Sequence, residues 1–255
     1  MTVVDPHSEV ETDLHASGHR LVIGCDEVGR GAIAGPVAVG MTVVDIECGA
    51  APAGLRDSKL LSEKRREHLA PLATQWARFG AVGLASAAEI DRIGIMAALG
   101  LAGRRALNQL VHSGAEVSEA VVLLDGNHDW LTPSLRRRVP VHTRVKADRD
   151  CVSVAAASVI AKVHRDRLMI TADRRIPGYG WTGNKGYGSA GHFAALGTLG
   201  PSTMHRHTWL HVRDGVVGVP AEGSAEVATE DPNEDPNEAP DAVAAGAGEG
   251  RREPS

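Results

Sequence analysis

The sequence predicts an α/β fold built on a sheet of mixed strand order. Short runs of apolar and β-branched residues, typical of buried strands, come first in succession and then alternate with segments of helical spacing. A glycine-rich turn, GRGAIAG at residues 29–35, separates the first two runs. Such a turn favours antiparallel pairing at the start of the sheet.

Each expected strand is a short run of apolar or small residues. The five runs, in chain order, are 21–25, 36–44, 78–84, 120–124 and 139–145. The fourth run ends at Asp125, and the fifth ends near Asp148.

Three helices are expected from spacing and caps. Residues 62–73 form a charged amphipathic segment, and residues 152–172 begin with SVAAASVIA, which is small enough to pack tightly on a sheet. Ser86 and Glu89 form a capping box for the remaining helix. Its apolar positions are Ile90, Ile93, Met96, Ala97 and Leu101.

Composition indicates one globular domain. The chain has 255 residues, of which 43% are hydrophobic and 23% charged, so it holds enough apolar material for a core. No apolar run approaches the roughly 18 residues of a membrane span, and the N-terminus lacks the pattern of a secretory signal. Cys25, Cys48 and Cys151 are far apart with no CxxC pair, which favours buried reduced thiols. We therefore expect a soluble cytoplasmic protein.

The two ends of the chain differ from its middle. Residues 220–255 are poor in apolar side chains and contain the tandem EDPNEDPNEAPD, so we expect a disordered acidic tail. Residues 1–18 are expected to be disordered as well, which leaves residues 19–219 as the folded domain. The net charge is −8 over residues 221–255, −4 over 1–18 and +7 over 19–220. A basic body with acidic ends suits a polyanionic ligand, but the acidic ends could equally serve solubility alone.

Four acids are predicted to lie at the edge of the sheet. Asp26 and Glu27 end the first strand and open into the turn, Asp125 ends the fourth strand, and Asp148 precedes the last helix. Carboxylates brought together repel one another and require a divalent cation, and ligation by oxygen alone favours Mg²⁺ or Mn²⁺ over zinc. Each acid alone could be a turn former. Their combination with a basic body and a glycine-rich loop favours a metal site.

Several patterns resemble other sites but are incomplete. The glycines of GRGAIAG are followed by Pro36 and a strand, where a dinucleotide-binding motif needs a helix. DGNHDW has Trp130 in the place of the glycine of an EF-hand loop. His205 and His207 have no evident partner pair for a metal.

Aromatic side chains gather in one glycine-rich segment, GYGWTGNKGYGSAGH at residues 178–192. Tyr187, flanked by glycine, is expected to expose its ring, which could stack on a sugar or base while Lys185 contacts phosphate. Trp181 and Trp209 could act in the same way or could form a small satellite core.

Seven segments in order resemble the bacterial ribonuclease HII family, the type 2 ribonucleases H. They are CDEVGRGAIAGPV, DSKLLSEKRRE, IDRIGI, LLDGN, KADRDCVSVAAASVIAKVHRD, NKGYGSAGH and GPSTMHRHTW. The resemblance runs from about residue 21 to residue 209. It implies a ribonuclease H-like mixed five-stranded sheet flanked by helices, with a C-terminal helical segment that helps to hold a duplex. It also implies a metal-dependent endonuclease that hydrolyses the RNA strand of RNA–DNA hybrids and cuts 5′ to single ribonucleotides in duplex DNA. The cut uses two Mn²⁺ or Mg²⁺ ions and leaves 3′-OH and 5′-phosphate ends.

The resemblance also implies roles for individual residues. The catalytic, metal-binding acids are Asp26, Glu27, Asp125 and Asp148. The substrate-binding residues are Gly29, Arg30 and Gly31 at the ribose 2′-OH, Tyr187 on the following deoxyribose, Ser58 and Lys59 at a phosphate, and Lys185 and Arg206 on the backbone. The sequence departs from the family at Leu60, where a second lysine is common, and at Ala147, where glycine is common. Arg136, Arg137 and Arg138 lie in a stretch that is longer than usual.

Two other functions compete with this one. A metal-dependent nuclease of the same fold that cuts DNA would share the four acids, but GRG beside them argues against it. A catalytically idle nucleic-acid-binding protein would not need all four. We expect a monomer that acts on RNA–DNA hybrid and ribonucleotide-containing duplex DNA without a membrane, and the acidic tail could dock a basic partner.

Overall fold

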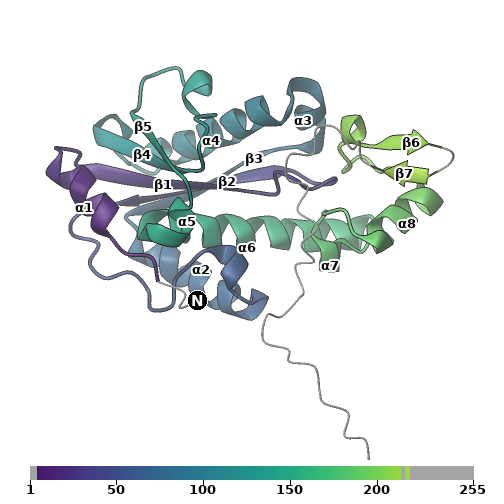
Figure 1. Cartoon of the computed structure of the whole chain (residues 1–255), viewed down its shortest axis with the longest axis horizontal. Coiled ribbons are helices and arrows are strands. Elements are labelled where there is room, and N and C mark those ends of the chain that lie inside the picture. Colours follow the sequence, from purple (N-terminus) through teal and green to yellow (C-terminus); the bar gives the residue numbers. More distant parts are fainter. Residues whose placement is uncertain (1–4, 214–215, 219–255) are drawn as a thin grey trace, which may run out of the picture.

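A mixed five-stranded sheet forms the centre of the computed structural model, which describes residues 5–213 and 216–218 (Figure 1). The strands of the sheet are β1 (Leu21–Val28), β2 (Val37–Val44), β3 (Phe79–Ala85), β4 (Ala120–Asp125) and β5 (Val141–Arg144). The helices are α1 (Glu9–Ala16), α2 (Glu63–Trp76), α3 (Ala87–Ile93), α4 (Ile95–His112), α5 (Ala147–Asp150), α6 (Val152–Arg175), α7 (Trp181–Asn184) and α8 (Ala190–Leu199). A two-stranded sheet of β6 (His211–Arg213) and β7 (Val216–Gly218) follows.

The strand order is β3-β2-β1-β4-β5. β1 pairs antiparallel with β2, and β2 antiparallel with β3, as the turn at 29–35 predicted. β4 is parallel to both β1 and β5. The carboxyl ends of β1, β4 and β5 therefore meet at one edge of the sheet, which is where ligands bind in open α/β sheets.

Helices cover both faces of the sheet. In Figure 1, α3 and α4 lie on one face, and α2, α5 and α6 lie on the other. Successive residues of β1 enter different apolar clusters: Ile23 and Cys25 pack with residues of α4, whereas Val22 packs with Val154 of α6. Because alternate residues of a strand face opposite sides, this double burial explains why β1 is apolar at nearly every position.

The capping box predicted from the sequence is confirmed, because Ser86 and Glu89 form it at the start of α3. At the start of α2, the Ser62 hydroxyl accepts from the Arg65 N–H. The single helix expected after Ser86 is wrong, because Gly94 has a φ of 76° and divides it into α3 and α4. A left-handed backbone of this kind ends a helix.

The expected disorder of residues 1–18 is wrong for residues 9–16, which form α1. Glu11 of this helix is buried, and its Oε1 accepts hydrogen bonds from the N–H and the hydroxyl of Ser153, at 2.9 and 2.6 Å. Ahead of α1, Asp5 pairs with Arg56 at 2.6 Å. The segment is ordered because it supplies a carboxylate to the first turn of α6, where helix N–H groups lack partners.

Two further predictions concern the tail and the cysteines. The predicted disordered tail at 220–255 lies outside the described residues. Cys25, Cys48 and Cys151 are free thiols, as expected; Cys25 and Cys151 are buried, whereas Cys48 is only half-buried, which corrects that part of the prediction. No helix in the described part combines the length and the apolar character that crossing a membrane requires.

Candidate active site

Three of the predicted acids lie on the neighbouring strands β1 and β4. Cys25 of β1 stands opposite Leu124 of β4, so the next residues along the two strands are Asp26 and Asp125. β1 continues to Val28, and the expectation that the backbone turns at Asp26 and Glu27 is therefore wrong. As adjacent strand residues, these two carboxylates start on opposite faces of the sheet.

Asp148 is brought to the same edge by a strained turn after β5. Lys146 has a φ of 63°, in the left-handed region, and α5 begins at the next residue. The Ala147 N–H donates to Oδ1 of Asp125 at 2.7 Å, which fastens this turn to the end of β4. The residue with the left-handed backbone is Lys146 and not Ala147. An alanine is therefore tolerated at position 147, where the sequence analysis noted that glycine is common.

Burial raises the pKa of all four acids, and the charges of neighbouring acids raise it further at Asp26, Glu27 and Asp148. For Asp26 burial is the main cause, followed by the charges of Glu27 and Asp125, and its pKa is well above the ordinary value. Burial also raises the pKa of Glu27 and of Asp125. Burial, with the charges of Asp57 and Asp125, raises the pKa of Asp148 to about 7. Protons or cations at this edge would relieve the repulsion.

Lys59 and Arg30 supply positive charge beside the acids. Burial lowers the pKa of Lys59, but the carboxylates of Asp57, Asp26 and Asp148 outweigh it, so the pKa is raised and the ammonium stays protonated. Nη1 of Arg30 lies 3.6 Å from Oε1 of Glu27. Lys59 is exposed, as a phosphate contact requires, whereas Ser58 is buried with its hydroxyl 2.8 Å from that of Ser158.

The four acids fit a divalent cation by chemistry. Their donor atoms are all carboxylate oxygens, and Oε2 of Glu27 is buried with no hydrogen-bond partner. Within residues 5–213 and 216–218, no three His, Cys, Asp or Glu side chains are already arranged to hold an ion. A bound cation would therefore have to draw the carboxylates closer together.

Asp57 belongs to this electrostatic cluster, although the sequence analysis did not single it out. Its side chain is buried; Oδ1 accepts from the Lys59 N–H at 2.9 Å, and Oδ2 lies 3.4 Å from Nε of Arg149. Its charge acts on both Lys59 and Asp148. The available signal was its position next to Ser58 and Lys59 in DSKLL.

Tyr187 is half-buried, and two cations of α6 lie beside its ring. Cζ of Arg165 is 5.4 Å from the ring centroid, and Nζ of Lys162 is 5.9 Å from it. Lys162 is itself buried and pairs with Asp166 at 2.9 Å. The sequence analysis missed both cations because helical spacing alone does not show which side chains reach a distant loop.

The structure corrects the expectation that Lys185 and Arg206 contact the substrate backbone. Only 4% of Lys185 is exposed, and its ammonium donates to the Thr182 carbonyl oxygen. Arg206 is completely buried and donates to the carbonyl oxygens of Gly29, Arg30 and Gly35. Both side chains hold the loops of the site from inside, because backbone carbonyls satisfy their donors.

The other aromatic and histidine predictions now have positions. Trp181 is buried in a cluster with Tyr179, His192 and His205, so it belongs to a satellite core. Trp209 is half-buried, with Cζ of Arg206 4.7 Å from its ring centroid. His205 is fully buried in this aromatic cluster, and a role in metal binding is not supported.

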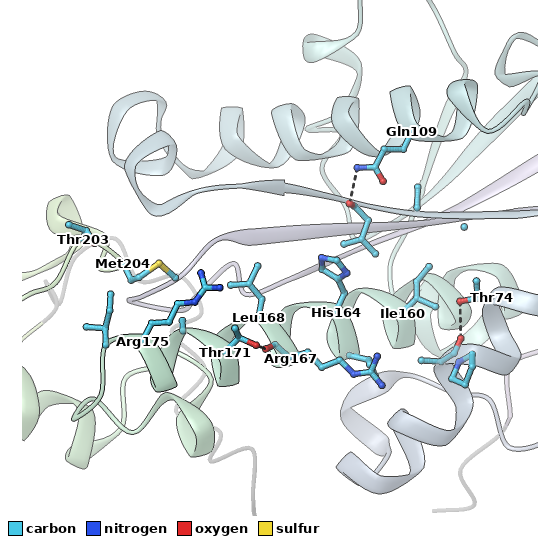
Figure 2. Close-up of a pocket in the computed structure, with 18 residues that line it drawn as sticks. Thr74, Gln109, Ile160, His164, Arg167, Leu168, Thr171, Arg175, Thr203 and Met204 are labelled. Carbon is cyan, nitrogen blue, oxygen red and sulfur yellow. Dashed lines mark hydrogen bonds between the residues drawn. The ribbon is translucent and has the colours of Figure 1, made fainter.

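A groove also lies elsewhere on the molecule. It has a volume of about 970 Å³ and is lined by side chains of α2, β3, α4 and α6 (Figure 2). Gln109 donates to the Val82 carbonyl oxygen at its rim. His164 lines the groove, but its lining contains no carboxylate, so it lacks the cluster of oxygen ligands that Mg²⁺ or Mn²⁺ prefers. We therefore place the candidate site at the carboxyl ends of β1 and β4.

A family model and curated relatives assign this chain to the same family, ribonuclease HII. A family model described as ribonuclease HII matches residues 23–212. The ribonuclease HII of Streptomyces griseus is 44% identical over 211 residues, which cover 81% of this chain and 85% of that protein. The ribonuclease HII of Caulobacter vibrioides is 41% identical over 216 residues, covering 83% and 95%.

Solved structures share the fold. Bst-RNase HIII in complex with Mn²⁺ superposes with a TM-score of 0.61 at 26% identity, covering 78% of this chain and 70% of that chain. The ribonuclease H2 of Pyrococcus horikoshii gives a TM-score of 0.56 at 25% identity, covering 74% and 93%. The mixed five-stranded sheet flanked by helices is thus the ribonuclease H-like fold that the sequence predicted.

Proposed function

Because this chain belongs to the ribonuclease HII family and is a metal-dependent ribonuclease H, we propose that it hydrolyses the RNA strand of RNA–DNA hybrids and cuts duplex DNA 5′ to a single embedded ribonucleotide. The products carry 3′-OH and 5′-phosphate ends. The proposal is supported most by the placing of Asp26, Asp125 and Asp148 at one edge of the sheet, from β1, β4 and α5. Burial raises the pKa of all three, and neighbouring acids raise it further at Asp26 and Asp148.

Asp26, Glu27, Asp125 and Asp148 would hold Mg²⁺ or Mn²⁺. Two ions bound there would supply activation of the attacking water and stabilisation of charge on the leaving 3′-oxygen. The protein's own part is to hold four carboxylates at one edge of the sheet, Asp26 and Asp148 buried and Glu27 and Asp125 half-buried. Without a cation these carboxylates repel one another, and relief of that repulsion favours ion binding. The Mn²⁺ in the Bst-RNase HIII complex is consistent with this assignment.

The ribose is recognised by the turn at residues 29–31. The carbonyl oxygens of Gly29 and Arg30 accept from the buried guanidinium of Arg206, and in the described structure the N–H groups of Arg30 and Gly31 have no acceptor. The turn therefore offers N–H donors to the substrate. A site built to hydrogen-bond the 2′-OH rejects deoxyribose, because the polar groups of the site would be left unpaired.

Two other groups orient the substrate. The ring of Tyr187 stacks on the deoxyribose that follows the ribonucleotide, and the ammonium of Lys59 contacts a phosphate. Both are accessible in the structure: Tyr187 is half-buried and Lys59 is exposed. The 2′-OH serves recognition and is not the nucleophile, so no 2′,3′-cyclic phosphate forms.

The test is a labelled DNA duplex with one ribonucleotide, incubated with Mg²⁺ or Mn²⁺ beside an all-DNA duplex. We expect one cut 5′ to the ribonucleotide, with a 3′-OH end, and no cut in the control duplex. Asp125→Asn should abolish the cut. Asp150→Asn removes the same charge from an exposed residue that pairs with Arg144 outside the proposed site, and it should leave cutting unchanged.

Three results would contradict the proposal. Equal cutting of the all-DNA duplex would indicate a general nuclease of the same fold. Binding without cutting in either metal would indicate a nucleic-acid-binding protein. A 2′,3′-cyclic product would show that the 2′-OH is the nucleophile.

A further inference from the structure

Arg165 is a buried cation with an unusual set of partners. It lies in α6, is completely inaccessible to solvent, and burial lowers the pKa of its guanidinium. No carboxylate in the described part of the chain forms an ion pair with it. Its donors go to backbone carbonyl oxygens instead: Nε to Pro36 at 2.9 Å, Nη1 to Lys185 at 2.8 Å and Nη2 to Ala34 at 3.2 Å. Burying an unpaired charge is costly, and these bonds offset the cost.

Those carbonyls belong to two segments far apart in the sequence. One is the stretch that follows the 29–31 turn, and the other is the loop that carries Tyr187. The same two segments also pair through their backbones, because the N–H groups of Ile33 and Ala34 both donate to the Gly186 carbonyl oxygen, at 2.9 and 3.0 Å. Arg165 therefore fastens together the two loops that contribute to substrate recognition.

Arg165 also touches both recognition elements directly. A Cβ added to Gly29 would lie 2.0 Å from Nε of Arg165, so the guanidinium fills the space beside this glycine. On the other side, Cζ of Arg165 is 5.4 Å from the centroid of the Tyr187 ring, a cation–π distance. One rigid planar group thus lies between Gly29 and Tyr187.

We propose that Arg165 is the positioning residue that fixes the spacing between the 29–31 turn and Tyr187, and that it thereby sets the preference for a ribonucleotide followed by a deoxyribonucleotide. The inference rests on the proposed function. The 2′-OH and the next deoxyribose are neighbours on one strand, so a site that recognises both needs its two contacts at a fixed separation. A lysine at this position would keep the charge but lose the planar fork that holds three carbonyls at once.

Arg206 provides a matched control, because it comes from another segment and binds the same 29–35 stretch. It is equally buried and also donates to three carbonyl oxygens, but all three belong to residues 29–35, and none belongs to the loop of Tyr187. Arg206→Lys should loosen the turn without changing its link to Tyr187. Arg165→Lys should loosen the link itself.

The experiment measures kcat/KM for a DNA duplex with one ribonucleotide and for a continuous RNA–DNA hybrid, which has no ribonucleotide–deoxyribonucleotide junction within the RNA strand. Arg165→Lys should lower the ratio of the two values by about tenfold or more, since a misplaced contact costs this much or more. Arg206→Lys should lower both values by similar factors. In a Tyr187→Leu background, Arg165→Lys should no longer change the ratio, because contacts that act together are not additive.

Gly186→Ala tests the spacing without changing Arg165. The added Cβ would lie 2.4 Å from the Ala34 carbonyl oxygen and would push the two loops apart. We expect the same selective loss on the single-ribonucleotide duplex. Thermal unfolding shows whether each variant folds. If Arg165→Lys does not fold, Gly186→Ala still tests the proposal.

The outcomes separate the two proposals. If the natural protein cuts the hybrid but not the single-ribonucleotide duplex, the proposed junction cleavage fails and this inference fails with it. If the natural protein cuts both, and Arg165→Lys and Gly186→Ala lower both values equally, only the inference is overturned. An Arg165→Lys effect that persists undiminished in the Tyr187→Leu background would also overturn it.

Discussion

Nε2 of His192 and Nε2 of His205 lie 3.0 Å apart in the satellite core behind Tyr187. The Ser202 N–H donates to Nδ1 of His205, and Nδ1 of His192 lies 2.8 Å from the Tyr187 carbonyl oxygen, which can only accept. The hydrogen of His205 is therefore on Nε2 and that of His192 on Nδ1, so both rings are neutral. A second proton would break this chain of hydrogen bonds.

We expect this pair to make the protein less stable in acid. Burial, followed by the charge of His192, lowers the pKa of His205 to about 4, and burial lowers that of His192. Groups with a depressed folded-state pKa contribute stability above their unfolded value of about 6.5 and lose it as the pH falls towards 4. The midpoint temperature of thermal unfolding should fall less steeply between pH 7 and pH 4 for His205→Asn than for the natural protein. His207→Asn, at an exposed ring, should keep the natural slope; equal slopes for all three proteins would contradict the assignment.

The carboxylate cluster predicts the opposite trend in the metal-free protein. The folded-state pKa of Asp148 is raised to about 7, so its contribution to stability is complete below the unfolded value near 4 and is lost as the pH rises through 7. Because a cation competes with that proton, Mn²⁺ affinity should increase as the pH rises to 7 and level off above it. Calorimetric titration at pH 6, 7 and 8 should show that Mn²⁺ binds roughly tenfold more weakly at pH 6 than at pH 8. Asp150→Asn should retain this dependence, and affinity that does not change with pH would show that no proton is displaced.

The sequence predicted those features whose causes are local. Apolar patterning placed Asp26 and Asp125 on strands at one edge of the sheet, although β1 continues past Asp26 to Val28, and the Ser86–Glu89 box needs only four neighbouring residues. Lys185, Arg206 and Glu11 were misassigned because their burial depends on carbonyls or hydroxyls far away in the chain. A charged side chain is expected at the surface unless its partners are known. Tertiary structure alone reveals those partners.

The contact between Glu11 and Ser153 predicts that the N-terminal helix stabilises the domain. Glu11→Ala would leave the N–H and hydroxyl of Ser153 buried without an acceptor, at a cost of about 1–3 kcal/mol in the free energy of unfolding. Urea denaturation measures this difference. Glu9→Ala, at an exposed position two residues earlier on the same helix, should change it by less than about 0.5 kcal/mol. An equal effect of both variants would mean that general helix charge, and not the bond to Ser153, matters.

Gly24 lies where β1 packs against the backbone of α6, two residues before Asp26. A Cβ at this position would lie 2.2 Å from the carbonyl carbon of Ser153 and 2.4 Å from its oxygen, and neither backbone atom can rotate away. Gly24→Ala must therefore displace α6 from the sheet, and we expect a loss of about 3 kcal/mol or more in the free energy of unfolding. Gly191→Ala is the matched control: this exposed glycine of α8 has open space around it, and alanine should stabilise the helix by up to about 1 kcal/mol. Denaturant unfolding of the two variants should thus shift in opposite directions. A Gly24→Ala protein as stable as the natural one would show that β1 and α6 are not packed backbone against backbone.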